Sequence, residues 1–394
     1  MAGDRSALDV TAVPEQRDRQ AGAEQPEEDA GEQDGGPDDR GSTVRPGMAS
    51  TSAIDLVVAG SVKLMIMEKT VLLGEVTCPS GELVLMDGGY LELWSGGRSP
   101  DELDGATALP ASDFEIVGSD AEVAARLFDH QSGRMLYDIP QHGVDEFSRL
   151  FAQHCRAHAK DAALRLFPQR ISHRDRARLA IAEGNPDFLI MGVPVVPVGG
   201  VPTERPLPVT AVPGEWGWSQ LRIGLREGAA VATRQLGRIG VDYARFVFAD
   251  ADALGSWVHE YPLDGLADVV FWGRDEEQVA AEFGAPRTGT PGEDGYGWLN
   301  LPVRDAYARA VALNDHRNVA PSRKFAFDFR PHSHHWQVMA GVRASDNEAA
   351  TIEIGGARVM MAMTSVGDGF FPVHLEVNAA GSPVAIRISV AGDG

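Results

Sequence analysis

The sequence has few cysteines, few lysines and no long apolar run. Cys78 and Cys155 are the only cysteines among 394 residues, which excludes a disulfide-stabilised scaffold and a metal cluster held by cysteines alone. Four lysines stand against 31 arginines in a chain rich in alanine and glycine, a usage typical of GC-rich bacterial genomes. No run approaches the roughly 18 apolar residues that suggest a membrane-spanning helix, because glycine and prolines interrupt the longest candidate, residues 188–198.

Basic side chains are also scarce. The chain carries 57 acidic residues against 35 lysines and arginines, a formal net charge of -22. This excess argues against a broad basic face for nucleic acid or anionic lipid, so neither a nucleic acid nor a membrane is an expected partner. A basic protein is the partner that such a surface would favour.

Part of the acidity is concentrated at the N-terminus. Residues 1–50 contain twelve acids and five arginines, a net charge of -7, which leaves -15 for the other 344 residues. The segment has almost no large apolar residues, so we expect an acidic disordered tail. It contains no basic start followed by an apolar run, as a secretory signal would. Together with the lack of a disulfide framework, this predicts a cytoplasmic location.

Alternating apolar residues and turn signals predict short strands, which stand alone up to residue 117 and are interspersed with helices of helical periodicity beyond it. A polar stretch between residues 226 and 242 is compatible with a helix, and no repeat of fixed period is evident. The expected strands are 55–58, 63–67, 71–77, 82–86, 90–94, 113–117, 219–225, 243–248, 269–272, 324–329, 351–354, 358–363, 371–377 and 384–390. The expected helices are one beginning at Ser119, 144–167, one beginning at Ser172, one from Asp275 to Gly284, 303–313 and 332–343.

Six prolines in residues 194–213 leave too few backbone donors for a central strand, so this segment is interpreted as a loop or connector. The resulting prediction is an α+β fold, rich in β-structure, with mainly antiparallel sheets and covering helices. Its domains would be an N-terminal α+β domain over 51–193 and a C-terminal α+β domain over 214–394. A small molecule bound between these two domains is a further hypothesis.

The common catalytic and nucleotide-binding motifs are missing. There is no G-x-x-x-x-G-K-[ST] loop and no G-x-G-x-x-G between a strand and a helix. Ser365 comes nearest to the G-x-S-x-G nucleophile elbow, but Met363 stands at its first position. These absences disfavour an ATPase, a dinucleotide-dependent oxidoreductase and an α/β-hydrolase.

Three histidines form the densest cluster of metal-ligating side chains. His332, His334 and His335 follow Asp328, and imidazole with carboxylate is the ligand set of zinc and iron sites. On a strand His332 and His334 would share a face, and on a helix His332 and His335 would, so a third ligand must come from elsewhere. A metal-dependent hydrolase using a divalent transition metal is therefore the alternative prediction. A polar helix start after Pro331 is the favoured interpretation.

The sequence Trp216-Gly217-Trp218 alternates aromatic residues. On a strand both indoles would lie on one face, where they could form a stacking surface. Filling of the hydrophobic core is the structural alternative for both tryptophans.

Residues 367–374, Gly-Asp-Gly-Phe-Phe-Pro-Val-His, resemble the closing motif W-G-D-G-x-[YF]-P-V-Y of an uncharacterised bacterial family, a domain of unknown function. The following residues 375–386 and the Pro-Ser-Gly turn within residues 73–84 are similar to other parts of that family. Val366 stands where the family has Trp, and His374 where it has Tyr. The resemblance implies a β-rich bacterial protein and transfers no catalytic residues.

The same motif has a physical interpretation of its own. Gly367 and Gly369 flank Asp368 in a turn, where the Asp368 carboxylate can accept hydrogen bonds from the backbone amides of that turn. A ligand-binding role for this carboxylate is the alternative.

These observations predict a non-enzymatic cytoplasmic protein that binds another protein, in an immunity-like or regulatory role, without a cofactor. The candidate binding residues are Asp368, Trp216 and Trp218. The oligomeric state is left open.

Overall fold

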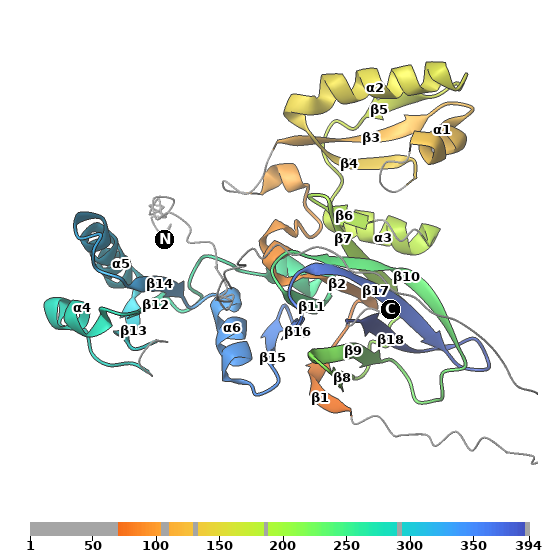
Figure 1. Ribbon diagram of the computed structural model, residues 1–394. Coiled ribbons are helices and arrows are strands. Elements are labelled where there is room, and N and C mark those ends of the chain that lie inside the picture. The colour runs from red at the N-terminus through yellow and green to blue at the C-terminus, as the bar shows by residue number, and fades with distance from the viewer. Residues whose placement is uncertain (1–69, 104–109, 129–132, 185–187, 290–293, 391–394) are drawn as a thin grey trace, which may run out of the picture. The chain divides into compact units, whose positions relative to one another are not determined.

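The computed structural model describes residues 70–103, 110–128, 133–184, 188–289 and 294–390 (Figure 1). The expected tail over 1–50 and the expected strands 55–58 and 63–67 lie outside these residues. The fold is α+β, with antiparallel sheets and covering helices, as the sequence predicts. None of the described helices is both long enough and apolar enough to cross a membrane.

Two runs of elements make up the described chain, which we call the first half (residues 71–224) and the second half (residues 232–389). The first half contains β1 (Val71–Val76), β2 (Glu82–Asp87), η1 (Gly88–Leu93), η2 (Pro100–Glu102), β3 (Ala111–Val117), α1 (Ala121–Phe128), β4 (Met135–Pro140), η3 (Gln141–Gly143), α2 (Val144–Ala157), β5 (Ala163–Leu166), α3 (His173–Glu183), β6 (Phe188–Ile190), β7 (Val193–Gly199), β8 (Leu207–Gly214) and β9 (Gly217–Gly224). The second half contains β10 (Ala232–Val241), β11 (Arg245–Asp250), η4 (Ala253–Ser256), β12 (Leu266–Trp272), α4 (Glu276–Phe283), β13 (Tyr296–Pro302), α5 (Val303–Val319), β14 (Ala326–Pro331), α6 (His334–Ala344), β15 (Ala349–Ile354), β16 (Ala357–Met363), β17 (Gly369–Val377) and β18 (Pro383–Ser389).

Two six-stranded antiparallel sheets pack face to face. Their strand orders are β1-β8-β9-β18-β17-β10 and β15-β16-β11-β2-β7-β6. Because side chains alternate along a strand, Leu83 and Leu85 of β2 enter the core between the sheets, whereas Val84 packs with Val338 of α6 on the opposite face. The second sheet is therefore buried on both sides.

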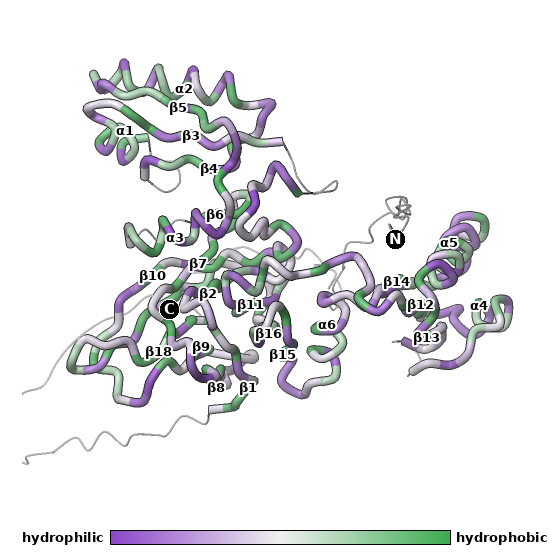
Figure 2. Tube along the Cα trace, turned by 180° about the vertical axis from the view of Figure 1, so that it is seen from behind, coloured by the Kyte–Doolittle hydropathy of each residue, from purple (hydrophilic) through white to green (hydrophobic). Residues whose placement is uncertain are grey.

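Each half also carries a three-stranded antiparallel sheet with two helices. We call residues 111–166 the first module and residues 266–331 the second module. The strand orders are β4-β3-β5 and β13-β12-β14. In the first module both helices bury apolar residues against one sheet face, among them Phe151 of α2 against Phe114 of β3. Polar residues alternate with apolar ones along α2, as this one-sided packing requires (Figure 2).

The second half repeats the first. Both contain two strands, a 3-10 segment (η1 and η2 in the first half, η4 in the second), a module, a helix and two hairpins in the same order. If β1–β9 are exchanged for β10–β18, the order of each large sheet reads the same from its other end. The halves are therefore related by a pseudo-two-fold axis. It passes between Arg222 and Arg387 in one sheet and between Leu85 and Phe248 in the other, where equivalent residues face each other.

Side-chain contacts repeat as well. The Nδ1 atom of His173 accepts a hydrogen bond from Ser95 N at 3.0 Å, and the ring lies 5.8 Å from Trp94. In the second half His334 accepts from Val258 N at 3.0 Å, and its ring lies 5.9 Å from Trp257. Each histidine follows the serine that caps its helix.

This repeat was missed because its spacing drifts. Trp94 and Trp257 are 163 positions apart, whereas Asp113 and Asp268 are 155 apart. The expectation that there is no repeat of fixed period held only because insertions shift the register between the equivalent strands.

The prediction of a proline-rich loop over 194–213 was wrong for most of the segment, because residues 194–199 belong to β7 and residues 207–213 to β8, while residues 200–206 connect the two strands. Pro197 lies opposite Val84, beyond the point where β6 stops pairing with β7. Pro208 lies opposite Glu75, just outside the β8–β9 ladder. Each proline thus stands where one side of its strand is unpaired, which spares the missing N–H. Both large sheets mix strands from before and after this segment, so the pairing does not follow the expected domain boundaries.

Four further expectations were wrong. Residues 90–94 belong largely to the 3-10 helix η1 rather than to a strand, and the polar stretch before residue 242 is mostly strand β10. The helix expected over 144–167 ends at Ala157, and the chain turns at Ala159 with φ 49° before β5 begins. The helix expected to begin at Ser119 begins at Ala121, and the Ser119 hydroxyl donates a hydrogen bond to Asp161.

Candidate functional site

Two loops from different halves meet at one end of the large sheets. The β8–β9 turn consists of Glu215 and Trp216, since Gly214 pairs with Gly217. It packs on the β16–β17 connection, where the Ser365 hydroxyl oxygen accepts a hydrogen bond from Trp218 N at 2.8 Å. Gly217 has φ 90°, and a Cβ at this position would overlap the Ser365 side chain. Glycine therefore permits both the turn and the close approach of the two loops.

Several large apolar side chains near this junction are exposed to solvent. The exposed fraction is 79% for Trp216 and 65% for Phe370, and Val366 and Tyr243 are also exposed. We call these four residues the aromatic surface. Arg238 of β10 lies opposite Pro372 of the neighbouring strand β17, with its guanidinium 5.7 Å from the centre of the Phe370 ring. This contact restrains Phe370 while leaving most of the ring accessible.

The three predicted binding residues belong to this region, in different roles. Trp216 is in the turn and exposed, whereas the side chain of Trp218 packs against the core between the sheets. The prediction that both indoles share a strand face was wrong, because the chain reverses at Trp216. Asp368 is exposed but does not bond the amides of its own turn as expected. Its Oδ1 accepts from Ala244 N at 2.9 Å, which ties the β10–β11 connection to the β16–β17 connection.

Exposed carboxylates lie next to members of the aromatic surface along the chain. Glu215, Asp242 and Asp368 are all exposed. Asp242 accepts a hydrogen bond of 2.8 Å from the Tyr90 hydroxyl, and the Tyr90 ring contacts Tyr243 edge-on with 5.8 Å between ring centres. The surface is therefore an apolar centre with an acidic margin.

The pseudo-two-fold axis provides an internal comparison. It carries this region onto a hollow of about 580 Å³ that is lined partly by Glu204, Arg205 and Arg226. The β10–β11 and β16–β17 connections correspond in length to their equivalents, but small or polar residues replace the exposed apolar ones. The β8–β9 turn of Glu215 and Trp216 differs, because its equivalent between β17 and β18 has five residues, 378–382. The residues equivalent to Tyr243, Val366, Asp368 and Phe370 are Ser80, Pro202, Glu204 and Pro206. The fold therefore forms these two connections without aromatic side chains and does not require Tyr243 or Phe370.

The predicted metal ligands do not converge on one point in the structure, because each has a different partner. His332 hydrogen-bonds Asp264 at 2.8 Å and Asp268 at 3.2 Å, and Asp328 pairs with Arg330. The Nδ1 atom of His334 is occupied by a backbone N–H, as described above. The described residues contain no group of three or more His, Cys, Asp or Glu side chains placed to hold a metal ion.

The protonation of these histidines follows from their surroundings. Burial opposes the charge of His332, but the hydrogen bonds to Asp264 and Asp268 outweigh it and raise the pKa. Burial lowers the pKa of His334. His335 stacks on His259 with ring centres 4.3 Å apart, and burial, together with the charge of that neighbour, lowers the pKa of His335 to about 2. His335 is therefore a neutral packed side chain.

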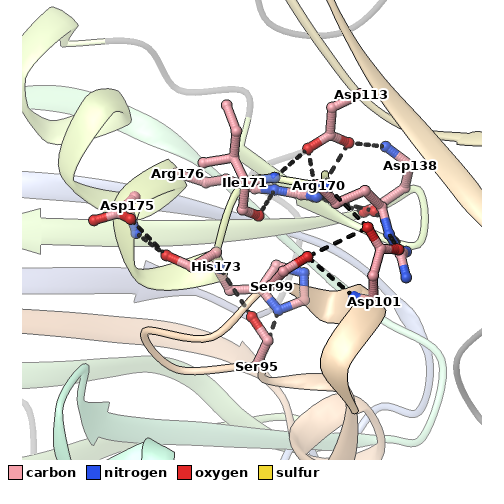
Figure 3. Close-up of polar contacts among 11 residues, drawn as sticks. Ser95, Ser99, Asp101, Asp113, Asp138, Arg170, Ile171, His173, Asp175 and Arg176 are labelled. Carbon is pink, nitrogen blue, oxygen red and sulfur yellow. Dashed lines mark hydrogen bonds and ion pairs between the residues drawn. The ribbon is translucent and has the colours of Figure 1, made fainter. Parts of the chain in front are cut away.

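A buried cluster of charges attaches the first module to α3 (Figure 3). Arg176 is fully buried and donates to Asp113 at 3.0 Å and to Asp138 at 2.7 Å. Arg170 adds bonds to Asp101 and Asp138. Burial opposes the charge of Asp138, but Arg176 holds its pKa below the usual range. Sequence reasoning missed this cluster because its members are distant along the chain.

The second half shows that the cluster has a structural role. Asp113 accepts from Asp138 N, and its equivalent Asp268 accepts from Asn300 N at 2.7 Å. Asp138 and Asn300 have φ of 54° and 55° at the same bulge. Both aspartates thus hold a strained backbone position. Because the carboxylates of Asp113 and Asp138 are engaged by arginine and backbone N–H groups, the aromatic surface is the better candidate site.

The resemblance of residues 367–374 to the bacterial family motif stays a prediction. No protein-family model, no curated protein and no solved structure matches this chain, so the aromatic surface is identified by its geometry and by the comparison of the two halves.

Proposed function

We propose that this protein is a non-enzymatic module that binds another protein through the aromatic surface. The observation that carries the proposal is the exposure of Trp216 in the β8–β9 turn, of Val366 in the β16–β17 connection that this turn contacts, and of Phe370 at the start of β17. Exposed apolar patches on folded proteins commonly mark interaction sites. Tryptophan and tyrosine are also the residues enriched among those that contribute most to binding.

The acidic margin favours a basic partner. Glu215, Asp242 and Asp368 flank the apolar centre, and the chain as a whole carries a net charge of -22. Such a potential increases the rate of encounter with a positively charged protein and disfavours acidic ones. Arg238 is engaged with Phe370, which supports the apolar centre rather than opposing the margin.

The β8–β9, β10–β11 and β16–β17 connections are joined by hydrogen bonds within the protein itself. Gly217, the Trp218–Ser365 hydrogen bond and the Ala244–Asp368 hydrogen bond join three connections into one rigid end. A preformed surface loses little conformational entropy on binding. An immunity-like or regulatory role in the cytoplasm fits these properties, and the buried unpaired cysteines Cys78 and Cys155 support that location.

Affinity capture from cells of the source organism tests the proposal. The tagged wild type is compared with Trp216→Ala/Phe370→Ala. The matched control is Leu299→Ala/Val319→Ala, which removes two exposed apolar side chains from the second module. We expect a basic protein that is retained by the wild type and the control but lost by the first variant.

The captured protein is then purified and its Kd is measured. Truncation of two central aromatic residues should weaken binding by at least about 30-fold, since each hot-spot side chain contributes about 2 kcal/mol or more. Binding should also weaken as ionic strength rises. Equal affinity for the wild type and the aromatic variant would overturn the proposal.

A further inference from the structure

A second hollow, in the second module, is lined by cationic side chains. It has a volume of about 530 Å³ and lies at the C-terminal end of β12 and the N-terminal end of β14. Small-molecule sites commonly enclose roughly 300–1,000 Å³. Four positively charged residues line this one hollow, although acidic residues outnumber basic ones 57 to 35 in the chain. The lining residues that carry the argument are Trp272, Arg274, Arg317, Arg323 and Lys324.

The backbone places two of these cations next to each other. Gly273 has φ 132°, and a Cβ there would lie 2.9 Å from Lys324 O. Asp275 N donates to Lys324 O at 3.2 Å, and Lys324 N donates to the Asp275 carboxylate at 2.7 Å. The residue after Gly273, Arg274, is thus fixed beside Lys324.

The first module forms the same junction without the cations. Asp120 N donates to Asp161 O at 3.1 Å, and Asp161 N donates to the Asp120 carboxylate at 2.8 Å. Gly118 has φ 123° and is in the same close contact with residue 161. The residues equivalent to Arg274 and Lys324 are Ser119 and Asp161, whose side chains hydrogen-bond each other. The fold therefore does not need positive charge at these two positions.

The cations are only partly neutralised by neighbouring acids. Arg274 pairs with Asp275, and Arg323 pairs with Glu282. Among the residues that the structure describes, the Lys324 ammonium has no acidic partner. Arg317 donates to the neutral Asn314 side chain. Arg274, Arg323 and Lys324 together face two paired carboxylates, so these residues leave the hollow net positive, which an anion would stabilise.

We propose that this hollow binds a phosphate-class anion with more than one charge, such as pyrophosphate or the polyphosphate of a nucleotide. Arginine offers paired donors to phosphate oxygens, and lysine adds a point charge. Trp272 lines the same hollow and offers an aromatic ring to a nucleotide base. This site is separate from the aromatic surface and does not depend on the proposed protein-binding function.

Isothermal titration with pyrophosphate and with ATP, at low salt and without divalent metal, tests the proposal. The variant Arg274→Ser/Lys324→Asp introduces the residues of the first module, which the same junction accommodates. The control Arg226→Ser/Arg234→Asp makes the same change of charge at exposed positions elsewhere.

We expect the first variant to bind both anions at least tenfold more weakly than the wild type, and the control to bind within twofold of it. Tighter binding of ATP than of pyrophosphate identifies a nucleotide as the ligand, and equal binding identifies the phosphate groups alone. Circular dichroism and thermal unfolding verify that both variants are folded. The proposal is overturned if the wild type binds neither anion at about 1 mM, or if the first variant retains wild-type affinity.

Discussion

At the residue scale, the charges of Asp113 and Asp138 depend on Arg176. Both carboxylates are buried, and both accept hydrogen bonds from this guanidinium. A buried ion pair contributes little compared with an apolar replacement of the whole cluster, but removing one partner leaves an uncompensated charge. Arg176 therefore contributes to stability mainly because its removal would leave the carboxylates of Asp113 and Asp138 buried without their counter-charge.

Arg176→Met should lower the free energy of unfolding by about 3–5 kcal/mol, because it leaves two buried carboxylates without their main counter-charge. Denaturant unfolding measures the change. Arg178→Ala is the control, since Arg178 is half-exposed on the same helix and pairs with Glu82, and it should cost less than about 1 kcal/mol. Equal losses for the two variants would contradict this account of the cluster.

His332 gives a pH-dependent prediction. Its pKa is raised in the folded protein, since the hydrogen bonds to Asp264 and Asp268 outweigh the effect of burial. A raised folded pKa contributes stability that is fully present below the unfolded pKa of about 6.5 and is lost as pH rises through the folded value. His332→Gln should therefore destabilise the protein more at pH 6 than at pH 9.

Chemical denaturation of wild type and His332→Gln at both pH values measures this difference. His142→Gln is the control, because His142 is exposed in η3. A loss of stability in His332→Gln that is the same at pH 6 and pH 9 would show that the two carboxylates do not favour the protonated ring.

At the element scale, the β8–β9 turn depends on the absence of a side chain at Gly217. Gly217→Ala must place a Cβ against Ser365 and also adopt φ 90°. Gly192→Ala is a matched control with φ 84°, where no atom of the described residues lies within 4 Å of the added Cβ. Both substitutions strain the backbone, and only the first adds an overlap.

We expect Gly192→Ala to cost about 1–2 kcal/mol of unfolding free energy, and Gly217→Ala to cost at least about 1 kcal/mol more. Gly217→Ala should also weaken partner binding, because the turn that carries Trp216 must move away from Ser365. Unfolding and binding measurements on both variants test this. Equal stability of the two variants would show that the loops are not in tight contact.

Elements with strong local signals were predictable. The helix between Asp275 and Gly284 matches α4, which ends at Gly284 in the left-handed conformation. Ser172 caps α3 through a hydrogen bond from Asp175 N, as its position before the helix suggested. Strand β10 was missed because its first residues are polar and exposed, so its pairing with β17 defines it.

At the scale of the whole molecule, the two halves share their cores. The strand pairs β2–β11 and β9–β18 join them at the centre of each large sheet. In either half alone, each of these central strands would lose its partner on one side and become a sheet edge, and exposed sheet edges favour association. The chain therefore resembles two copies of one unit fused into a pseudo-dimer.

Residues 70–226 and 227–390, produced as separate chains in one cell, should assemble into a 1:1 complex. The break falls in the exposed segment between β9 and β10, where no strand pair is cut. Purification through a tag on one half, followed by size-exclusion chromatography with light scattering, tests this. Recovery of the tagged half alone as a stable monomer would contradict the shared-core description.

The sequence by itself determined the α+β class, most helices and strands, and two residues of the candidate region, Trp216 and Asp368. These depend on local patterns: alternation, helical periodicity, caps and turns. The tertiary structure decided the roles of Pro197 and Pro208, the exposure of Phe370, and the dispersal of the histidines. It also revealed the repeat, because equivalent residues such as Trp94 and Trp257 are related by strand pairing and packing, which conserve positions in space while the spacing along the chain drifts.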